Sequence, residues 1–373
     1  MAPAASSPTT PTTTNNKGRV LIVGGTGFIG KFVTEASLST THQTYLLVRP
    51  GPLMSSKVAT IKTFQEKGAI VIYGRVNNKE FMEMILKKYE IDVVISAIGG
   101  ADGLLDQLIL VEAMKSINTI KRFLPSEFGH DVDRADPVEP GLTMYKQKRL
   151  VRRVIEESGV PYTYICCNSI ASWPYYDNCH PSQLPPPLDQ LHIYGHGDVK
   201  AYFVDGYDIG KFTMKVIDDD RTINKNVHFR PSANCYSMNE LASLWENKIA
   251  RKIPRVTVSE DDLLAISAEN CIPESIVASI THDIFINGCQ VNFKIDGIHD
   301  VEISTLYPGE SLRSLEDCYE KFVVMAADKI HKEETGVTAA GGGGAKALVE
   351  PVPAAGGGGT KALVEPVPIT ASC

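Results

Sequence analysis

The stretch from Arg19 to Gly30 reads Arg-Val-Leu-Ile-Val-Gly-Gly-Thr-Gly-Phe-Ile-Gly, and it decides the fold. Its apolar part, 20–23, predicts a buried strand that ends abruptly in glycines. The glycines have the G-x-x-G-x-x-G spacing that allows a tight turn, close approach of a pyrophosphate and close packing of the next helix. A plain Gly-rich turn is the alternative. The expected dinucleotide-binding residues are Gly24, Gly25, Thr26, Gly27, Phe28, Ile29 and Gly30.

The residue that closes the next expected strand, 44–48, indicates which dinucleotide binds. NAD-preferring sites place an acid at this point, about 20 residues beyond the glycines. This chain has Arg49 there, and a guanidinium attracts the 2′-phosphate that a carboxylate would repel. The sequence therefore predicts NADPH, with Lys57 as a second positive charge. The alternative for Arg49 is a solvated side chain at a strand end.

Composition limits the classes of partner. The chain has 373 residues and a net charge of −7, which argues against nucleic acid or an anionic membrane surface. It contains no apolar run near the roughly 20 residues that span a bilayer, so we expect no stable membrane insertion. The eight cysteines lack paired metal-ligand spacing, which predicts reduced thiols, no metal site and a cytoplasmic protein.

Apolar runs alternate with amphipathic helical patterns through the first half of the chain. This order predicts right-handed β-α-β units and a Rossmann-type, doubly wound parallel sheet, followed by a smaller mixed α/β lobe. A further strand is expected at 291–295. The expected organisation is a disordered tail at 1–16, an NADPH-binding domain at 17–168 to which segments near 200–235 return, a mainly substrate-binding lobe at 169–332 and a disordered Gly/Pro-rich repeat at 333–373.

Ligands of such sheets bind at the carboxyl ends of the strands, so the loops there should line one crevice. Ser96 ends one expected strand and is small enough to let a cofactor ribose approach. His130 lies in another of these loops, where it could shuttle a proton or merely cap a turn. Asn168 and Ser169 provide short polar side chains after a third strand.

One expected helix places Tyr145, Lys148 and Arg152 on the same face. Short-chain dehydrogenases use Tyr-x-x-x-Lys, but position 149 is Arg149, which cannot replace a titrating lysine. Lys148 is then the candidate base, because partial burial and neighbouring positive charges would lower its pKa. A solvated basic helix face is the alternative. The neighbouring charges are Lys146, Arg149, Arg152 and Arg153.

These residues together resemble the plant isoflavone reductase-like family of NADPH-dependent, atypical short-chain dehydrogenases. The resemblance covers about 17–332 and excludes the repeated tail. Its motifs are the glycine turn, Arg122-Phe-Leu-Pro-Ser-Glu-Phe-Gly129, and Lys148 with Arg152. Stretches similar to the leucoanthocyanidin reductase branch are Arg122-Phe-Leu-Pro125, Ile165-Cys-Cys-Asn168, Thr281-His-Asp283 and Gly129-His130-Asp131.

The resemblance implies a reaction in proanthocyanidin biosynthesis. NADPH would reduce a flavan-3,4-diol such as leucocyanidin to a flavan-3-ol such as catechin, through a quinone methide and hydride transfer to C4. Lys148 would be the general base, His130 would assist loss of the 4-hydroxyl, and Arg152 would contact the cofactor. Related isoflavone, lignan and phenylcoumaran benzylic ether reductases, and a non-catalytic NADP-sensing regulator, stay open as alternatives. The implied substrate-binding residues are Met144, Tyr145, Asn168, Ser169 and His282.

Overall fold

The computed structural model describes residues 18–99, 103–177 and 184–335. The predictions of disorder for 1–16 and for the repeat from 336 onward concern residues outside these ranges. The last helix, α11 (Leu315–Thr335), extends slightly beyond the expected boundary at 332. Among the described helices, none is both long enough and apolar enough to cross a bilayer.

A five-stranded parallel sheet forms the centre of the first half of the chain, as expected from the sequence. Its order is β3-β2-β1-β4-β5, so the chain reverses direction across the sheet between β1 and β4. Val23, at the end of β1, is paired with Leu47 on one side and Ser96 on the other. The strands are β1 (Arg19–Val23), β2 (Gln43–Val48), β3 (Ile70–Tyr73), β4 (Val93–Ser96) and β5 (Arg122–Leu124).

A second parallel ladder continues beside β5. It has the order β13-β10-β6, and an isolated bridge between Phe123 and Tyr162 connects it to the first sheet. Late segments of the chain therefore pair with a strand of the first half. The strands are β6 (Thr163–Cys166), β10 (Lys225–His228) and β13 (Asp300–Glu302).

The strand predicted at 291–295 is wrong, because this segment is irregular and the strand forms later, at β13. The carboxylate of Asp296 accepts hydrogen bonds from the backbone N–H groups of Ile298, His299 and Asp300. A side chain that binds nearby backbone in this way competes with strand pairing.

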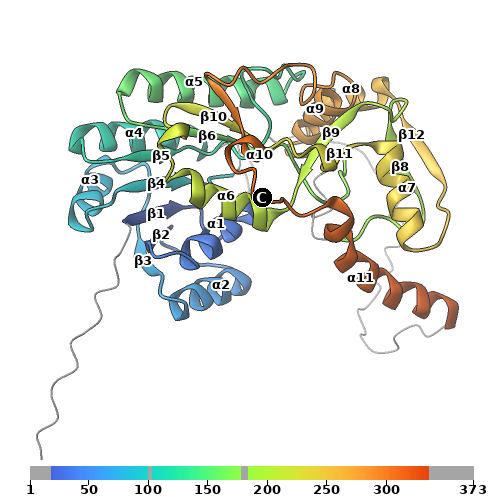
Figure 1. The fold of residues 1–373 in the computed structure, drawn as a ribbon, viewed down its shortest axis with the longest axis horizontal. Coiled ribbons are helices and arrows are strands. Elements are labelled where there is room, and N and C mark those ends of the chain that lie inside the picture. The colour runs from blue at the N-terminus through green and yellow to red at the C-terminus, as the bar shows by residue number, and fades with distance from the viewer. Residues whose placement is uncertain (1–17, 100–102, 178–183, 336–373) are drawn as a thin grey trace, which may run out of the picture.

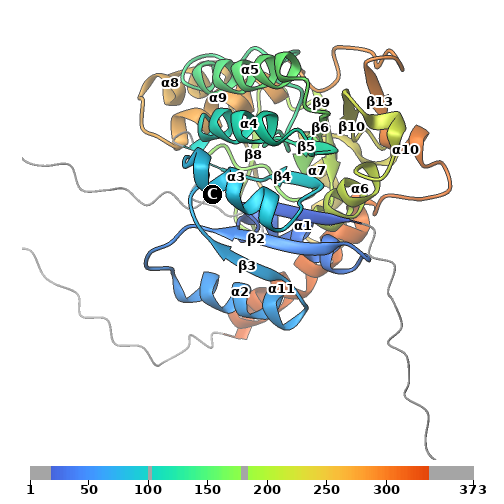
Figure 2. The ribbon, with the colours of Figure 1, turned by 90° about the vertical axis from the view of Figure 1, so that its left-hand side faces the viewer.

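Helices cover both faces of the sheet (Figure 2). Alternate residues of β1 point to opposite sides, so Val20 and Ile22 belong to one buried cluster while Leu21 and Val23 belong to the other. The first cluster contains α1 (Phe28–Leu38), α2 (Ser55–Glu66) and α6 (Gly206–Val216). The second contains α3 (Lys79–Lys88), α4 (Asp106–Ile117) and α5 (Gly141–Ser158).

The remaining elements gather beyond the carboxyl ends of the sheet strands, at the right of Figure 1. They enclose a third buried cluster around Trp173, Trp245 and Tyr319. Two small sheets form here, β11-β9-β7 and β12-β8. The elements are β7 (Ser169–Ile170), β8 (Leu191–Tyr194), β9 (Lys200–Val204), β11 (Cys235–Ser237), α7 (Met238–Lys248), β12 (Arg255–Val258), α8 (Glu260–Ala268), α9 (Glu274–Phe285) and α11, while α10 (Ile303–Leu306) packs beside β13.

Candidate functional site

The glycine turn after β1 has no room for side chains. Gly24 has a φ of +76°, and a Cβ added there would lie 2.4 Å from the carbonyl oxygen of Ala97. A Cβ on Gly30 would lie 2.1 Å from the carbonyl oxygen of Gly24. The backbone of Gly27 donates to that same oxygen at 2.9 Å and closes the turn. Both glycines are therefore required by the local backbone rather than by flexibility alone.

The amino end of α1 is suited to binding an anion. The helix begins directly after Gly27, which provides no capping side chain, and its first turn contains no acidic residue. Helix N-terminal N–H groups without side-chain partners bind phosphate well. Ser96 lies opposite Val23 at the end of β4, and its buried hydroxyl has no hydrogen-bond partner in the described chain. The expected cradle residues thus lie together, with Thr26, Phe28 and Ile29 only partly buried.

Positive side chains gather at the neighbouring strand ends. Arg49 is exposed just after β2, and Lys57 is half-buried in the first turn of α2. Arg75, which sequence reasoning missed, follows β3, where the N–H of Gly74 donates to the carbonyl of Val48 at 3.0 Å. Within the described ranges, none of the three cations has an ion pair or side-chain hydrogen bond.

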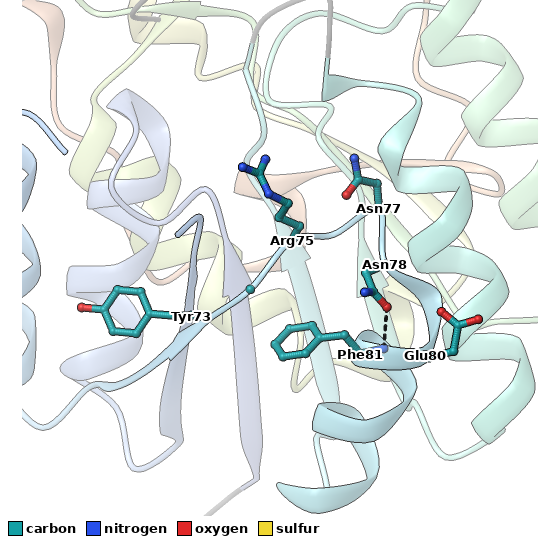
Figure 3. Close-up of a pocket in the computed structure, with 7 residues that line it drawn as sticks. Tyr73, Arg75, Asn77, Asn78, Glu80 and Phe81 are labelled. Carbon is teal, nitrogen blue, oxygen red and sulfur yellow. Dashed lines mark hydrogen bonds between the residues drawn. The ribbon is translucent and has the colours of Figure 1, made fainter. Parts of the chain in front are cut away.

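A hollow of about 490 Å³ opens at this end of β3 (Figure 3). Arg75 and Asn77 lie on the side away from Tyr73, and Glu80 lies in the first turn of α3. NADPH carries a 2′-phosphate and a pyrophosphate. The three unpaired cations can bind the 2′-phosphate, and the uncapped N-terminus of α1 can bind the pyrophosphate. The residues present therefore fit NADPH.

Lys148, in the middle of α5, is half-buried and directed toward the loop after β5. Its Nζ donates to the backbone carbonyl of Glu127 at 2.9 Å. Burial lowers the pKa of Lys148, and Arg152 adds to this effect, although the Glu127 carboxylate opposes it. The prediction that burial lowers the pKa of Lys148 is therefore confirmed. Of the four neighbouring positive charges expected to add to this effect, Arg152 does so. A lysine with a lowered pKa can act as a base at moderate pH.

His130 is buried in the same loop and is hydrogen-bonded through Nε2 to the hydroxyl of Tyr145. Burial lowers the pKa of His130 to about 3, and the nearby charge of Lys148 acts in the same direction. The imidazole is therefore uncharged in the free protein at neutral pH. The structure thus brings together the three candidate groups of the sequence analysis, His130, Tyr145 and Lys148.

Three other expected substrate contacts lie around these groups. Asn168 has a left-handed backbone, with φ of +61°, and its N–H donates to the carbonyl of Gly129 at 2.9 Å. Its side-chain amide donates to the carbonyl of Phe229. Ser169 accepts a hydrogen bond from Gln290, and Met144 is half-buried at the edge of the third cluster. Asn168 is therefore fixed by two hydrogen bonds beside the His130 loop.

Arg152 does not lie on the crevice surface. Its side chain is fully buried, and its guanidinium binds the carboxylates of Glu127 at 2.7 Å, Asp131 at 2.6 Å and Asp133 at 3.0 Å. It also stacks over the ring of Tyr164. The buried guanidinium of Arg152 thus holds the loop after β5 together through three carboxylates. The expected contact between Arg152 and the cofactor stays a prediction.

His282 is directed away from the other candidate groups. Its Nε2 hydrogen-bonds to Glu260 of α8 at 3.0 Å, so it joins two helices. The next residue, Asp283, faces His130 instead, because neighbouring residues of a helix point in different directions. The substrate contact expected at His282 stays a prediction, and Asp283, which the sequence analysis did not name as a site residue, is the residue of this stretch that lies beside His130.

Two buried groups combine side chains that bind metals elsewhere, with ligand atoms within 4.8 Å of one another. The candidate ligand atoms already have protein partners: Nε2 of His130 is hydrogen-bonded to Tyr145, Asp131 is bound to Arg152, and Nε2 of His228 is hydrogen-bonded to Asp300. We assign a metal to neither. The groups are His130, Asp283 and Cys289, and Asp131, Cys166 and His228.

Comparisons with protein families, with curated proteins and with solved structures point to the same group of reductases. The model of the NmrA-like family matches residues 16–318. The chain is 73% identical over 320 residues to a leucoanthocyanidin reductase from Desmodium uncinatum, which covers 86% of this chain and 84% of that protein. It is 41% identical over 308 residues to a phenylcoumaran benzylic ether reductase from Ginkgo biloba, with coverages of 82% and 99%.

The fold is similar to that of a leucoanthocyanidin reductase from Vitis vinifera, solved in a binary complex with NADPH. The TM-score is 0.79 with 63% sequence identity, and the match covers 82% of this chain and 100% of that one. The chain therefore has the same overall fold as that reductase.

Proposed function

Because this chain belongs to the NmrA-like family and, within it, to the leucoanthocyanidin reductases, we propose that it reduces a flavan-3,4-diol such as leucocyanidin to a flavan-3-ol such as catechin. It is an NADPH-dependent oxidoreductase acting on a small molecule. The observation that supports this reaction most strongly is the half-buried Lys148 beside the buried His130–Tyr145 pair. A base and a proton donor are both needed to remove a benzylic hydroxyl.

The cofactor would be held along the glycine edge of the sheet. The turn from Gly24 to Gly30 and the first N–H groups of α1 would bind the pyrophosphate. Arg49, Lys57 and Arg75 would bind the 2′-phosphate, and Ser96 would lie beside the nicotinamide half. When bound, NADPH supplies the hydride that is added to C4 of the substrate.

A benzylic alcohol does not accept hydride, so the side chains must first convert it into an acceptor. Lys148, as a neutral amine, takes the proton of the 7-hydroxyl, which is para to C4. The ring then expels the 4-hydroxyl, the C4–O bond breaks and a quinone methide forms. His130, directly or through a water, gives the proton that lets hydroxide leave as water. Once C4 has been reduced, the ring is aromatic again, and the 7-oxygen recovers its proton from the ammonium of Lys148, which restores the neutral amine.

The other expected substrate-binding residues would orient the flavonoid. Tyr145 and Asn168 are each fixed by hydrogen bonds within the protein, and Met144 and Ser169 lie at the edges of the same region. Fixed side chains reduce the cost of ordering the substrate and keep water from the reactive quinone methide.

The test is an assay of the purified protein with leucocyanidin and NADPH. An isoflavone, a lactol-type lignan and a phenylcoumaran ether are offered in parallel. Conversion of leucocyanidin to catechin in preference to the others supports the proposal. Preference for one of the others assigns the related reductase activity, and NADPH binding without consumption of any substrate assigns a sensing role.

We also propose a cytosolic location. Six cysteines in the described residues are all free thiols, a state that reducing compartments maintain. Fractionation of plant tissue with an antibody to this chain tests it, and recovery in a secretory compartment would contradict it.

A further inference from the structure

Asp283 is a buried carboxylate without a cation. It is 3% exposed, and in the described part of the chain no lysine, arginine or histidine nitrogen lies within 4.0 Å of it. The charge of an isolated carboxylate is costly to bury unless other groups stabilise it. A buried carboxylate without a cation, placed beside candidate catalytic groups, often has a functional role.

Neutral donors hold the carboxylate of Asp283 in place. The N–H of Asp136 donates to Oδ2 at 3.2 Å, and the side-chain amide of Asn287 donates to Oδ1 at 3.3 Å. The thiol of Cys289 is also hydrogen-bonded to Asp283, and burial with this carboxylate raises the pKa of Cys289, which keeps its proton. These donors fix the direction of the carboxylate but leave its negative charge uncancelled.

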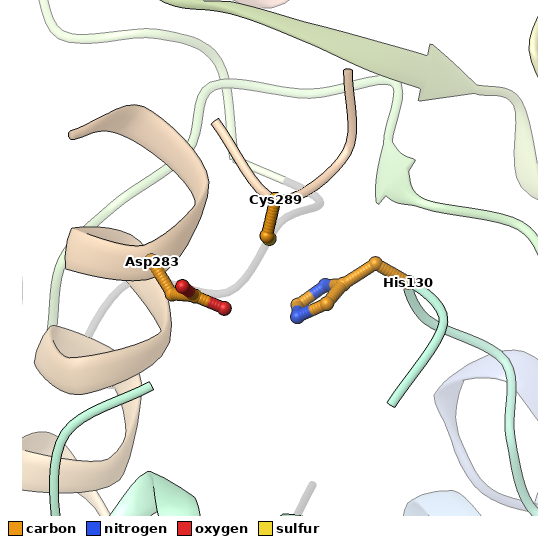
Figure 4. Close-up of side chains that lie close together, drawn as sticks. All are labelled: His130, Asp283 and Cys289. Atoms are coloured by element: carbon orange, nitrogen blue, oxygen red, sulfur yellow. The ribbon is translucent and has the colours of Figure 1, made fainter. Parts of the chain in front are cut away.

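The side chains of His130, Asp283 and Cys289 point toward one another (Figure 4). A ring nitrogen of His130, a carboxylate oxygen of Asp283 and the Cys289 sulfur lie within 4.8 Å of one another. His130 comes from the loop after β5 and Asp283 from α9, so tertiary packing brings them together. At this separation, in a buried region, a fixed carboxylate can orient an imidazole and attract its protonated form.

The other charged groups near His130 either disfavour the protonated imidazole or favour it only weakly. Burial and Lys148 both disfavour the imidazolium, while Asp131 favours it. The carboxylate of Asp131 is bound to Arg152 and Arg134, which reduces its influence. Tyr145 and Cys289 are neutral, and Arg149 acts on Tyr145 from α5. Asp283 is therefore a carboxylate near His130 that, within the described chain, has no lysine, arginine or histidine nitrogen within 4.0 Å.

We propose that Asp283 is a positioning residue for His130, orienting the imidazole and stabilising its protonated form so that a proton can be given to the departing 4-hydroxyl. This inference rests on the proposed function. His130, which is uncharged in the free protein, takes a proton from water in the substrate complex. This proton passes from the imidazole nitrogen to the leaving oxygen as the C4–O bond breaks, water departs and the imidazole is neutral again.

A double-mutant cycle in the full-length protein tests the proposal. Asp283→Asn removes the charge, His130→Gln removes the group on which it acts, and both are combined in a third variant. Asp283→Ser removes the same charge with a smaller side chain, in case the amide prevents folding. Asp136→Asn is the matched control, because it changes a nearby carboxylate whose side chain is 84% exposed.

We expect Asp283→Asn to lower kcat for leucocyanidin about tenfold, the effect of one pKa unit on the protonated fraction. Calorimetry should show unchanged NADPH binding, and Asp136→Asn should keep kcat within about twofold. In the His130→Gln background, Asp283→Asn should cost less than about twofold, because the two residues act together.

Equal losses in both backgrounds would show a merely structural role and overturn the inference. Unchanged kcat in the single variant would overturn it as well. Absence of turnover by the unmodified protein is a different result, because it would reject the proposed function and the inference with it.

Discussion

The amine of Lys148 donates to the backbone carbonyl of Glu127 at 2.9 Å, while the carboxylate of the same Glu127 is bound to Arg152 at 2.7 Å. The backbone of Glu127 thus orients Lys148, while the carboxylate of Glu127 binds Arg152. The lysine is positioned without an ion pair within 4.0 Å in the described chain. Burial lowers the pKa of Lys148, and the Glu127 carboxylate opposes this shift only in part.

Replacing Arg152 with methionine should destabilise the protein strongly. The variant leaves the buried carboxylates of Glu127 and Asp131 without their shared cation, a change that costs about 3–5 kcal/mol in other proteins. Urea unfolding of both proteins measures the difference in unfolding free energy. Arg153→Gln, which removes a half-exposed charge from the same helix, should cost less than about 1 kcal/mol. Similar losses in the two variants would contradict the role given to the Arg152 network.

His130→Ala should slow the reduction of leucocyanidin less than loss of Lys148 does. A water can partly replace a proton donor, whereas the amine of Lys148 starts the reaction. Steady-state kcat values for the two alanine variants provide the comparison. A loss for His130→Ala equal to or greater than that for Lys148→Ala would make His130 the essential group.

The buried His130 should also make stability depend on pH. Its pKa is about 3 in the native protein against 6.5 for the free side chain, so between these values the unfolded chain binds a proton that the native chain does not. Stability should therefore fall as the pH falls from 6.5 toward 3, by up to about 1.4 kcal/mol per pH unit from this group. Urea unfolding between pH 7 and pH 4 should show a smaller decline for His130→Gln. Parallel curves would show that His130 is not buried as an uncharged group.

Arg49→Ala should weaken binding of NADPH about tenfold and leave binding of NADH nearly unchanged. The variant removes a charged contact to the 2′-phosphate, which NADH lacks. Calorimetric titration with 2′,5′-ADP and 5′-AMP isolates this contact from catalysis, and Arg75→Gln should behave in the same direction. Lys87→Gln, at the far end of α3, removes an exposed charge remote from the strand ends and is the control. Equal weakening of both nucleotides by Arg49→Ala would contradict the assignment.

The fold was predictable because its determinants are local. The apolar run before Gly24 and the alternation with amphipathic helices specify β-α-β units, and the structure has the expected parallel sheet around β1. Gly24 and Gly30 were recognisable because close backbone contacts leave no space for a Cβ. Such requirements depend on sequence spacing alone.

The finer site was less predictable because it depends on tertiary packing. Lys148 and His130 meet because α5 packs against the loop after β5. From the sequence, only the order of the motifs along the chain indicated that these two residues lie close together. Helix periodicity could not show that Asp283 rather than His282 faces His130, since α9 packs on α5 from a distant part of the chain. Arg152 lies on the same helix face as Lys148 in sequence, but its carboxylate partners come from a loop 19 to 25 residues away.

The most direct test of the account is the rate of catechin formation from leucocyanidin and NADPH by the Lys148→Ala variant. Lys146→Ala serves as the control, because Lys146 is exposed on the same helix and is paired with Glu139 at 3.4 Å. The account predicts a loss of about a hundredfold or more for Lys148→Ala, with NADPH binding close to that of the unmodified protein and Lys146→Ala nearly fully active. A Lys148→Ala rate close to that of the unmodified protein would contradict the assignment of Lys148 as the base.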